Sequence, residues 1–129
     1  MLAKNVVSLW ARSGLAWLLF TMLFGMYLGI TGQFGISSPH AHAGLLGGLW
    51  AIGFSYLFNR ADGDKNIRFA FWQWLLFNLG VACHMTALWM VLMVDPKWGV
   101  LIGLGGGTIT LTTIWIVLVL WPALQGDEN

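Results

Sequence analysis

Four long apolar stretches, separated by short polar segments, dominate the pattern of the chain. A helix needs about 20 predominantly apolar residues to cross a hydrocarbon core of about 30 Å, and each stretch is close to that length or longer. The predicted spans are residues 14–31, 42–59, 67–94 and 98–124. We therefore expect an all-α fold that is integral to a lipid bilayer.

The connections between these spans are short and contain residues that stop helices. A polar turn is expected at 59–66, and Asp95-Pro96-Lys97 forms another because proline cannot continue the third helix. Together with residues 32–39, these turns leave no linker long enough to separate domains. The chain is expected to form a single transmembrane domain, residues 1–129, built as an up-down four-helix bundle.

The composition supports this prediction and excludes other classes of function. The chain is 58% hydrophobic and 9% charged, whereas a soluble domain typically has about 25% charged residues. The net charge is only +1, and the chain has no basic stripe that could neutralise a row of phosphates. We therefore expect no nucleic acid partner. The single cysteine excludes a disulfide framework within the chain.

Lysine and arginine are distributed unequally between the two sides of the predicted bundle. Lys97 stands on one side, and the other side, which holds both termini and the second turn, has Lys4, Arg12, Arg60, Lys65 and Arg68. The positive-inside rule places that second side in the cytoplasm. We expect a multi-pass protein of the cell inner membrane with cytoplasmic N- and C-termini.

Histidines are the candidates for chemistry, because ionisable side chains at membrane depth are usually functional and no acid, lysine or arginine is expected there. Pro39, His40 and His42 open the second span, and Pro39 suits a helix start. Residues two apart on a helix point about 200° apart, so the two histidines cannot chelate one metal together. One is expected to face the bundle and the other the interface.

His42 suits a single axial metal ligand, because small residues follow it on the same helix. Gly44, Gly47 and Gly48 would leave room for something flat and bulky, such as a porphyrin. The alternative is that these glycines only allow helices to pack closely, as small residues often do in membranes.

His84 is the second candidate and lies in the third span. It is about ten residues from the turn at Asp95, which places it ~15 Å deep at ~1.5 Å per residue. A porphyrin could lie between His42 and His84, or stand upright with one histidine on iron and the other lining the open face. Alternatively, His84 is a buried residue that bonds a neighbouring helix through Asn78 or a threonine.

A stripe of small residues in the fourth span indicates a helix contact. Gly99, Gly103 and Gly107 recur at every fourth position. We expect this stripe to pack within the bundle or between subunits of a symmetric homo-oligomer.

The segment 42–48, His-Ala-Gly-Leu-Leu-Gly-Gly, resembles the second-helix motif of the styrene oxide isomerase family, small four-helix membrane enzymes that bind haem b. Residues 18–20 and 65–68 are similar in kind to the same family. The segment 40–42, with the run that follows it, also resembles short proteins that are like subunit I of haem-copper oxidases. Both resemblances imply haem and four helices.

The isomerase resemblance implies that His42 is the axial ligand of haem b and that the chain forms a homotrimer. It also implies that ferric iron acts as a Lewis acid, which opens a small hydrophobic epoxide to give an aldehyde. The chain departs from the family at two pocket positions: Gly48 replaces an asparagine, and His84 falls at or near a tyrosine.

The residues assigned to this hypothesis form three sets, and His42 belongs to two of them. His84 and Asn78 are the catalytic candidates, and His42 is the metal ligand. The residues expected to contact the cofactor are His42, His40, Gly44, Gly47 and Gly48.

Two rival hypotheses stay open. In the first, His42 and His84 both ligate iron, which gives a six-coordinate haem that carries electrons or senses a gas. In the second, the chain is a structural membrane subunit without a cofactor. The ligation state separates the two haem hypotheses, because Lewis-acid catalysis needs an open iron position.

Overall fold

The computed structural model describes residues 2–61 and 69–125, with side chains from residue 5 onward, and every regular element in these ranges is helical. The elements in chain order are α1 (Leu2–Thr31), η1 (Phe34–Ile36), α2 (Ser37–His42), η2 (Ala43–Trp50), α3 (Ala51–Arg60), α4 (Ala70–Met93), η4 (Pro96–Trp98) and α5 (Gly99–Gln125). They make up four spans that are long and apolar enough to cross a membrane, since η1 to α3 follow one another without a break. The all-α, four-span prediction is confirmed.

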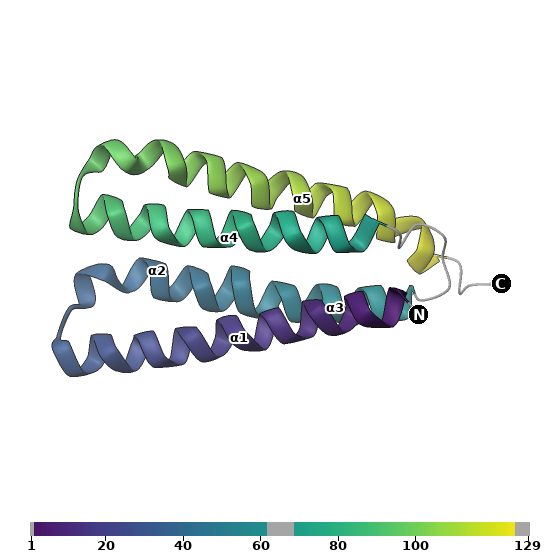
Figure 1. Cartoon of the computed structure of the whole chain (residues 1–129), viewed down its shortest axis with the longest axis horizontal. Helices are drawn as coiled ribbons and strands as arrows, with labels where there is room; N and C mark the ends of the chain where they lie inside the picture. The colour runs from purple at the N-terminus through teal and green to yellow at the C-terminus, as the bar shows by residue number, and fades with distance from the viewer. Residues whose placement is uncertain (1, 62–68, 126–129) are drawn as a thin grey trace.

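The four spans form two antiparallel hairpins that lie side by side (Figure 1). In the first hairpin α1 packs against η2 and α3, and in the second α4 packs against α5 along most of its length. Because consecutive spans alternate in direction, α1 begins at the same end of the molecule at which α5 finishes. This is the predicted up-down order.

The first two spans begin earlier than predicted. α1 starts at Leu2 rather than at residue 14, because no glycine or proline interrupts the chain before Gly14. The predicted connection 32–39 is mostly helical, and only Gly32 and Gln33 separate α1 from η1. Gly32 has a φ of 69°, the left-handed conformation in which glycine commonly ends a helix.

The two predicted polar turns have different outcomes. The turn at 59–66 lies largely outside the described residues, since Asn59 and Arg60 complete α3 and positions 62–66 are not described; neither are 67 and 68, the first two residues of the predicted third span. The second turn is confirmed: the Asp95 carboxylate accepts a hydrogen bond of 2.8 Å from the Lys97 backbone N–H and lies 3.2 Å from the Lys97 ammonium.

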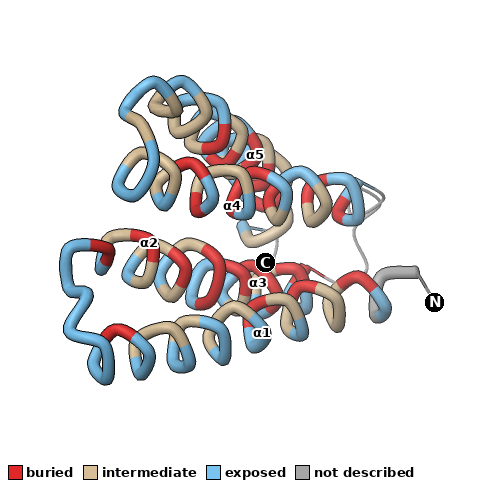
Figure 2. Tube along the Cα trace, turned by 60° about the vertical axis from the view of Figure 1, so that its left-hand side comes forward, coloured by how far each residue is buried: buried red, intermediate tan, exposed pale blue. Residues whose placement is uncertain are grey.

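An aromatic cluster joins the two hairpins in the half of the molecule that holds the termini. Trp10 lies 5.3 Å from Phe54, 5.8 Å from Phe58 and 5.3 Å from Phe77 between ring centres. Trp10, Phe58 and Phe77 are fully buried. Figure 2 shows that buried residues follow the faces where helices meet. The core therefore ties α1 and α3 to α4 at this level.

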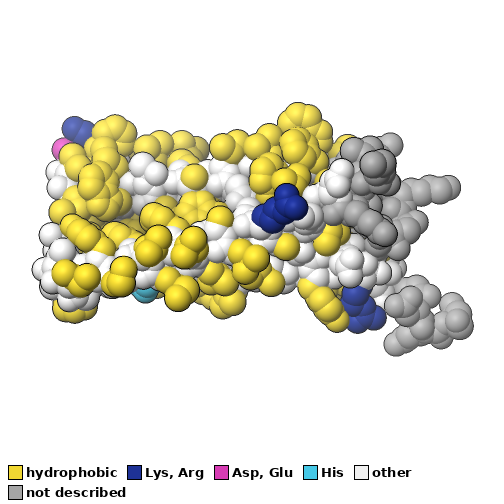
Figure 3. All heavy atoms as spheres, turned by 60° about the horizontal axis from the view of Figure 1, so that its bottom comes forward, with side chains coloured by type: hydrophobic (Ala, Val, Ile, Leu, Met, Phe, Trp, Pro, Cys, Tyr) yellow, Lys and Arg dark blue, Asp and Glu magenta, His cyan; other side chains and the backbone are white. Residues whose placement is uncertain are grey.

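The outer surface of the bundle is apolar. Met22, Ile30, Val100 and Leu111 are each at least 70% exposed. Hydrophobic side chains cover much of the face in Figure 3, and the described charged side chains lie at the end opposite the termini or in the part nearest to them. So much exposed apolar area would be unfavourable in water and suits contact with lipid.

Candidate functional site

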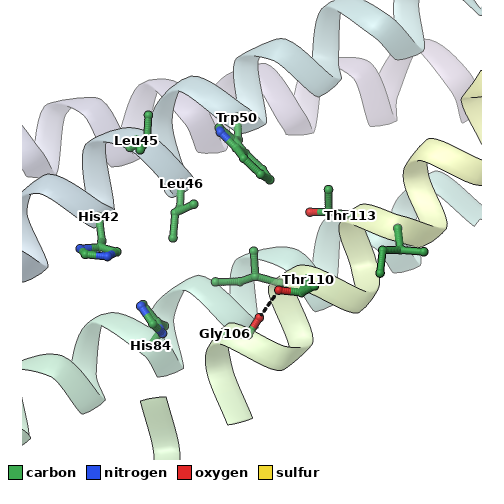
Figure 4. Close-up of a pocket in the computed structure, with 10 residues that line it drawn as sticks. His42, Leu45, Leu46, Trp50, His84, Gly106, Thr110 and Thr113 are labelled. Carbon is green, nitrogen blue, oxygen red and sulfur yellow. Dashed lines mark hydrogen bonds between the residues drawn. The ribbon is translucent and has the colours of Figure 1, made fainter. Parts of the chain in front are cut away.

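A cavity of about 420 Å³ lies between the second span, α4 and α5 (Figure 4). Its size falls in the range of small-molecule sites. The lining residues are His42, Leu45, Leu46, Trp50, His84, Gly106, Ile109, Thr110, Thr113 and Ile114. The cavity is therefore mostly apolar, with two imidazoles at one end and two threonines on α5.

His42 and His84 face each other across this cavity (Figure 4). Their ring centres are 5.4 Å apart and the ring planes are tilted by 49°. His42 is the last residue of α2 in the first hairpin, and His84 lies in α4 of the second. The structure thus brings together the two candidate histidines, between which a porphyrin was predicted to lie.

Both imidazoles are held through the same ring nitrogen. Nδ1 of His42 donates to the Ser38 carbonyl oxygen at 2.8 Å, and Nδ1 of His84 donates to the Ile102 carbonyl oxygen at 3.2 Å. A carbonyl oxygen only accepts, so the proton of each neutral ring must be on Nδ1. Nε2 of each ring then keeps its lone pair, which is the state of a metal-ligating histidine.

The helix next to His42 is wound more widely than an α-helix. Residues Ala43–Trp50 form a π-helix, which is rare and often found at functional sites. It places Leu45, Leu46 and Trp50 along the cavity. This winding was not predicted, although a segment with three glycines in five residues indicates that a regular helix is weakened there.

The glycines predicted to leave room for a porphyrin face α1 instead of the cavity. A methyl group added to Gly47 would lie 2.5 Å from Cγ of Trp17, and one on Gly48 would lie 2.5 Å from Cδ2 of Leu18. A methyl group on Gly44 would be 3.0 Å from the Thr21 side chain. These three positions serve the close packing of the second span on α1, which is the alternative role considered for them.

Asn78 does not line the cavity; it makes one hydrogen bond to α1 and one within its own helix, α4. Its Oδ1 accepts a hydrogen bond of 3.0 Å from the Trp17 indole, and its Nδ2 donates to the Trp74 carbonyl at 2.9 Å. His84 bonds a backbone carbonyl of α5 rather than Asn78 or a threonine. The structure therefore does not bring Asn78 to the histidines.

His40 points away from His42, as the helical geometry predicted. Its Nδ1 donates to the Thr21 carbonyl oxygen at 2.9 Å, and its ring lies beside Phe24 of α1. A methyl group on Gly25 would be 2.6 Å from the His40 ring, so this glycine makes room for that ring where the two helices meet. His40 thus joins α1 to α2 and does not line the cavity.

The small residues of α5 have two different surroundings. A methyl group on Gly105 would lie 2.6 Å from the backbone nitrogen of His84, so this glycine lets α5 touch α4. The predicted stripe of Gly99, Gly103 and Gly107 has nothing within 4 Å of an added methyl group among the described residues. Packing within the bundle therefore uses Gly105, not that stripe.

The set of possible metal donors at this site is small. Among the described residues no group of three or more histidine, cysteine, aspartate or glutamate side chains could hold a metal ion. A structural zinc ion takes four protein ligands. A haem iron is held by one or two axial protein ligands, because the porphyrin supplies the others. Two imidazoles with free Nε2 atoms fit haem better than a bare ion.

Comparison with known proteins adds no assignment: no family model, curated protein or solved structure matches this chain.

Proposed function

We propose that this chain is an integral membrane protein that binds haem b between its two hairpins. The observation that carries the proposal is the facing pair of His42 and His84, each with Nδ1 fixed by a backbone carbonyl and Nε2 left as an acceptor. His42 is the proposed axial ligand, in accordance with the family resemblance.

The spacing of the two rings supports a shared metal centre. The ring centres are 5.4 Å apart and the ring planes are tilted by 49°, so the two imidazoles stand close enough to hold one group between them.

The wall of the cavity suits an apolar guest that arrives from the bilayer. Three of the lining residues are also exposed on the outside of the bundle: Leu45 by 52%, Trp50 by 40% and Ile114 by 50%. The cavity therefore opens sideways, and a flat apolar group can enter without crossing an aqueous phase. With cytoplasmic termini in the inner membrane, as the positive-inside rule proposes, the histidines lie in the outer half.

The proposed activity is isomerisation of a small hydrophobic epoxide to an aldehyde. Ferric haem would supply a Lewis acid for the epoxide oxygen. The contribution of the chain is to exclude water with Leu45, Leu46 and Ile109, because water would trap a cationic intermediate as a diol. The second imidazole, His84, would line the face on which substrate lies.

A second candidate function is electron transfer or gas sensing by a six-coordinate haem. The observation that favours it is the short His42–His84 distance, because a second imidazole already stands opposite the first. In that case no iron position is open to an epoxide.

Self-association is part of the proposal, with a homotrimer as the state that the resemblance implies. Gly99, Gly103 and Gly107 support it, because they leave a shallow strip on α5 that no described residue of the chain fills.

Absorption spectra of the protein purified from membranes, in ferric and ferrous forms, test the proposal. We expect a Soret band, and its absence from protein expressed with sufficient haem would overturn both haem functions. Gas chromatography of the products formed from styrene oxide then separates the candidates. Phenylacetaldehyde supports the isomerase, whereas a bis-histidine spectrum that does not respond to the epoxide supports the second candidate.

A further inference from the structure

A second cavity, of about 310 Å³, lies between α1, α2 and α4 and shares no lining residue with the histidine cavity. This aromatic cavity is lined by Phe20, Phe24, Pro39, Met85, Thr86 and Trp89. His84 lines the first cavity and Met85 the second, because consecutive residues of a helix point about 100° apart. Neither the family resemblance nor the histidine pair accounts for the aromatic cavity.

The wall of the aromatic cavity is not the kind that acyl chains commonly meet. Between α3 and α5, a cavity of about 240 Å³ has leucine, isoleucine or valine at five of its seven lining positions. The aromatic cavity has three aromatic rings and a thioether, and no leucine, isoleucine or valine of the described chain lines it. Aromatic rings and thioethers both attract an aromatic ring more strongly than burial alone explains. The composition of the wall therefore favours an aromatic guest.

The two phenylalanine rings of the wall are fixed by contacts with their neighbours. The ring centres of Phe20 and Phe24 are 5.7 Å apart and the ring planes are within 24° of parallel. Phe24 also stacks on Tyr27 at 6.2 Å and lies 6.4 Å from the His40 ring. Trp89 supplies a third aromatic surface, from α4. Little side-chain order is lost when a guest binds to a wall that is held in this way.

The polarity of the wall indicates a neutral guest. No charged side chain of the described residues lines the aromatic cavity, and its one side-chain polar group there is the Thr86 hydroxyl. A charged guest would be strongly unfavourable at membrane depth. Phe20 and Trp89 are also exposed on the outside of the bundle, so a guest can enter sideways from the bilayer.

The volume of the aromatic cavity limits the size of the guest. An apolar cavity of about 150 Å³ is large enough to hold benzene. About 310 Å³ therefore accommodates one aromatic ring with a short substituent.

We propose that the aromatic cavity is a binding site for a neutral molecule with one aromatic ring, which packs against Phe20, Phe24 and Trp89 and contacts the Met85 thioether. A small arene dissolved in the bilayer is a guest of this kind. The site is separate from the histidine pair and does not require haem.

The test compares toluene with methylcyclohexane, which have the same carbon skeleton and differ in aromaticity. Dissociation constants of both are measured in the same detergent from the dependence of the melting temperature on probe concentration. The ratio of the two constants is compared between variants, so that partition of the probes into micelles cancels. We expect Phe24→Leu and Trp89→Leu each to reduce the preference for toluene by about 2- to 10-fold, the value of one aromatic pair.

Trp72→Leu is the matched control, since it is the same substitution at another exposed tryptophan of α4 that does not line the aromatic cavity. It should leave the ratio unchanged. Equal affinities of the two probes for the unsubstituted protein would indicate a groove that any apolar chain fills, and would overturn the inference. An unchanged ratio in both Phe24→Leu and Trp89→Leu would also overturn it.

The methyl resonance of Met85 locates the guest directly. Met85 is buried beside the aromatic cavity, whereas Met22 and Met26 are exposed on α1 and line neither cavity. In protein labelled with ¹³C at its methionine methyl groups, the ring current of bound toluene should shift the Met85 signal, assigned with Met85→Leu, more than those of Met22 and Met26. A saturating toluene titration that leaves the Met85 signal in place would overturn the inference. This readout is independent of the Soret band.

Discussion

Gly105 of α5 lies directly against the backbone of His84 in α4. An added methyl group would be 2.6 Å from the His84 nitrogen and 2.8 Å from its Cα, and neither atom can move without the helix. The position of one cavity histidine is thus set by a glycine on another helix, and substitutions there should affect both stability and the histidine pair.

Gly105→Ala should push α5 away from α4 and lower the free energy of unfolding by about 1–3 kcal/mol, as overpacking of a tight contact does. Thermal or denaturant unfolding in detergent micelles measures this. Gly29→Ala in α1 is the control, because its added methyl group meets nothing within 4 Å among the described residues. If both variants unfold alike, the α4–α5 contact at Gly105 is not as tight as described.

Gly47→Ala tests the contact between the second span and α1. The new methyl group would lie 2.5 Å from Cγ of Trp17, a ring that cannot withdraw easily because its indole is bonded to Asn78. We expect a loss of about 1–3 kcal/mol in unfolding experiments. Gly53→Ala, with nothing within 4 Å of the added group, should be neutral or stabilising; equal losses would contradict the packing role.

His42→Ala should abolish the Soret band, because no other described side chain on its hairpin takes its place beside His84. His84→Ala should keep a haem that is five-coordinate if the protein is an isomerase. If His84 is an axial ligand, the same variant changes a six-coordinate spectrum. Retention of the full band in His42→Ala would show that the axial assignment is wrong.

His40→Ala serves as the control for the histidine substitutions. Its ring bonds Thr21 on α1, so the variant should lose about 1 kcal/mol of stability, the value of one hydrogen bond, and keep the absorption spectrum. Altered ligation in this variant would place His40 in the cofactor site, as the sequence analysis had it.

Asn78→Leu distinguishes a catalytic amide from a structural one. The bond from the Trp17 indole is expected to contribute about 0.6 kcal/mol, typical for side-chain bonds between membrane helices. A double-mutant cycle with Trp17→Phe measures that coupling through unfolding. Turnover of styrene oxide should follow the amount of folded protein; a specific loss of turnover at full stability would argue for catalysis.

The sequence predicted the features that depend on composition and helical period. Apolar length identified the four spans, and the 100° step between residues separated His40 from His42 correctly. The pairing of His42 with His84 was predicted only as one possible arrangement around a porphyrin, because the rotation of α4 depends on its contact with α5 at Gly105, which no local pattern encodes.

The role of the glycines in the second span could not be predicted from the sequence. Gly44, Gly47 and Gly48 have the spacing of a helix contact, and the same residues suit a cofactor surface equally well until the position of α1 is known.

The two imidazoles belong to different hairpins, residues 2–61 and 69–125, and each is anchored within its own hairpin. A guest that binds both rings therefore also links the two hairpins to each other. Such a guest stabilises the folded bundle by RT ln(1 + [L]/Kd), where [L] is its free concentration and Kd its dissociation constant. Ligand binding and folding are therefore coupled equilibria, and the melting temperature should rise with the concentration of the bound molecule.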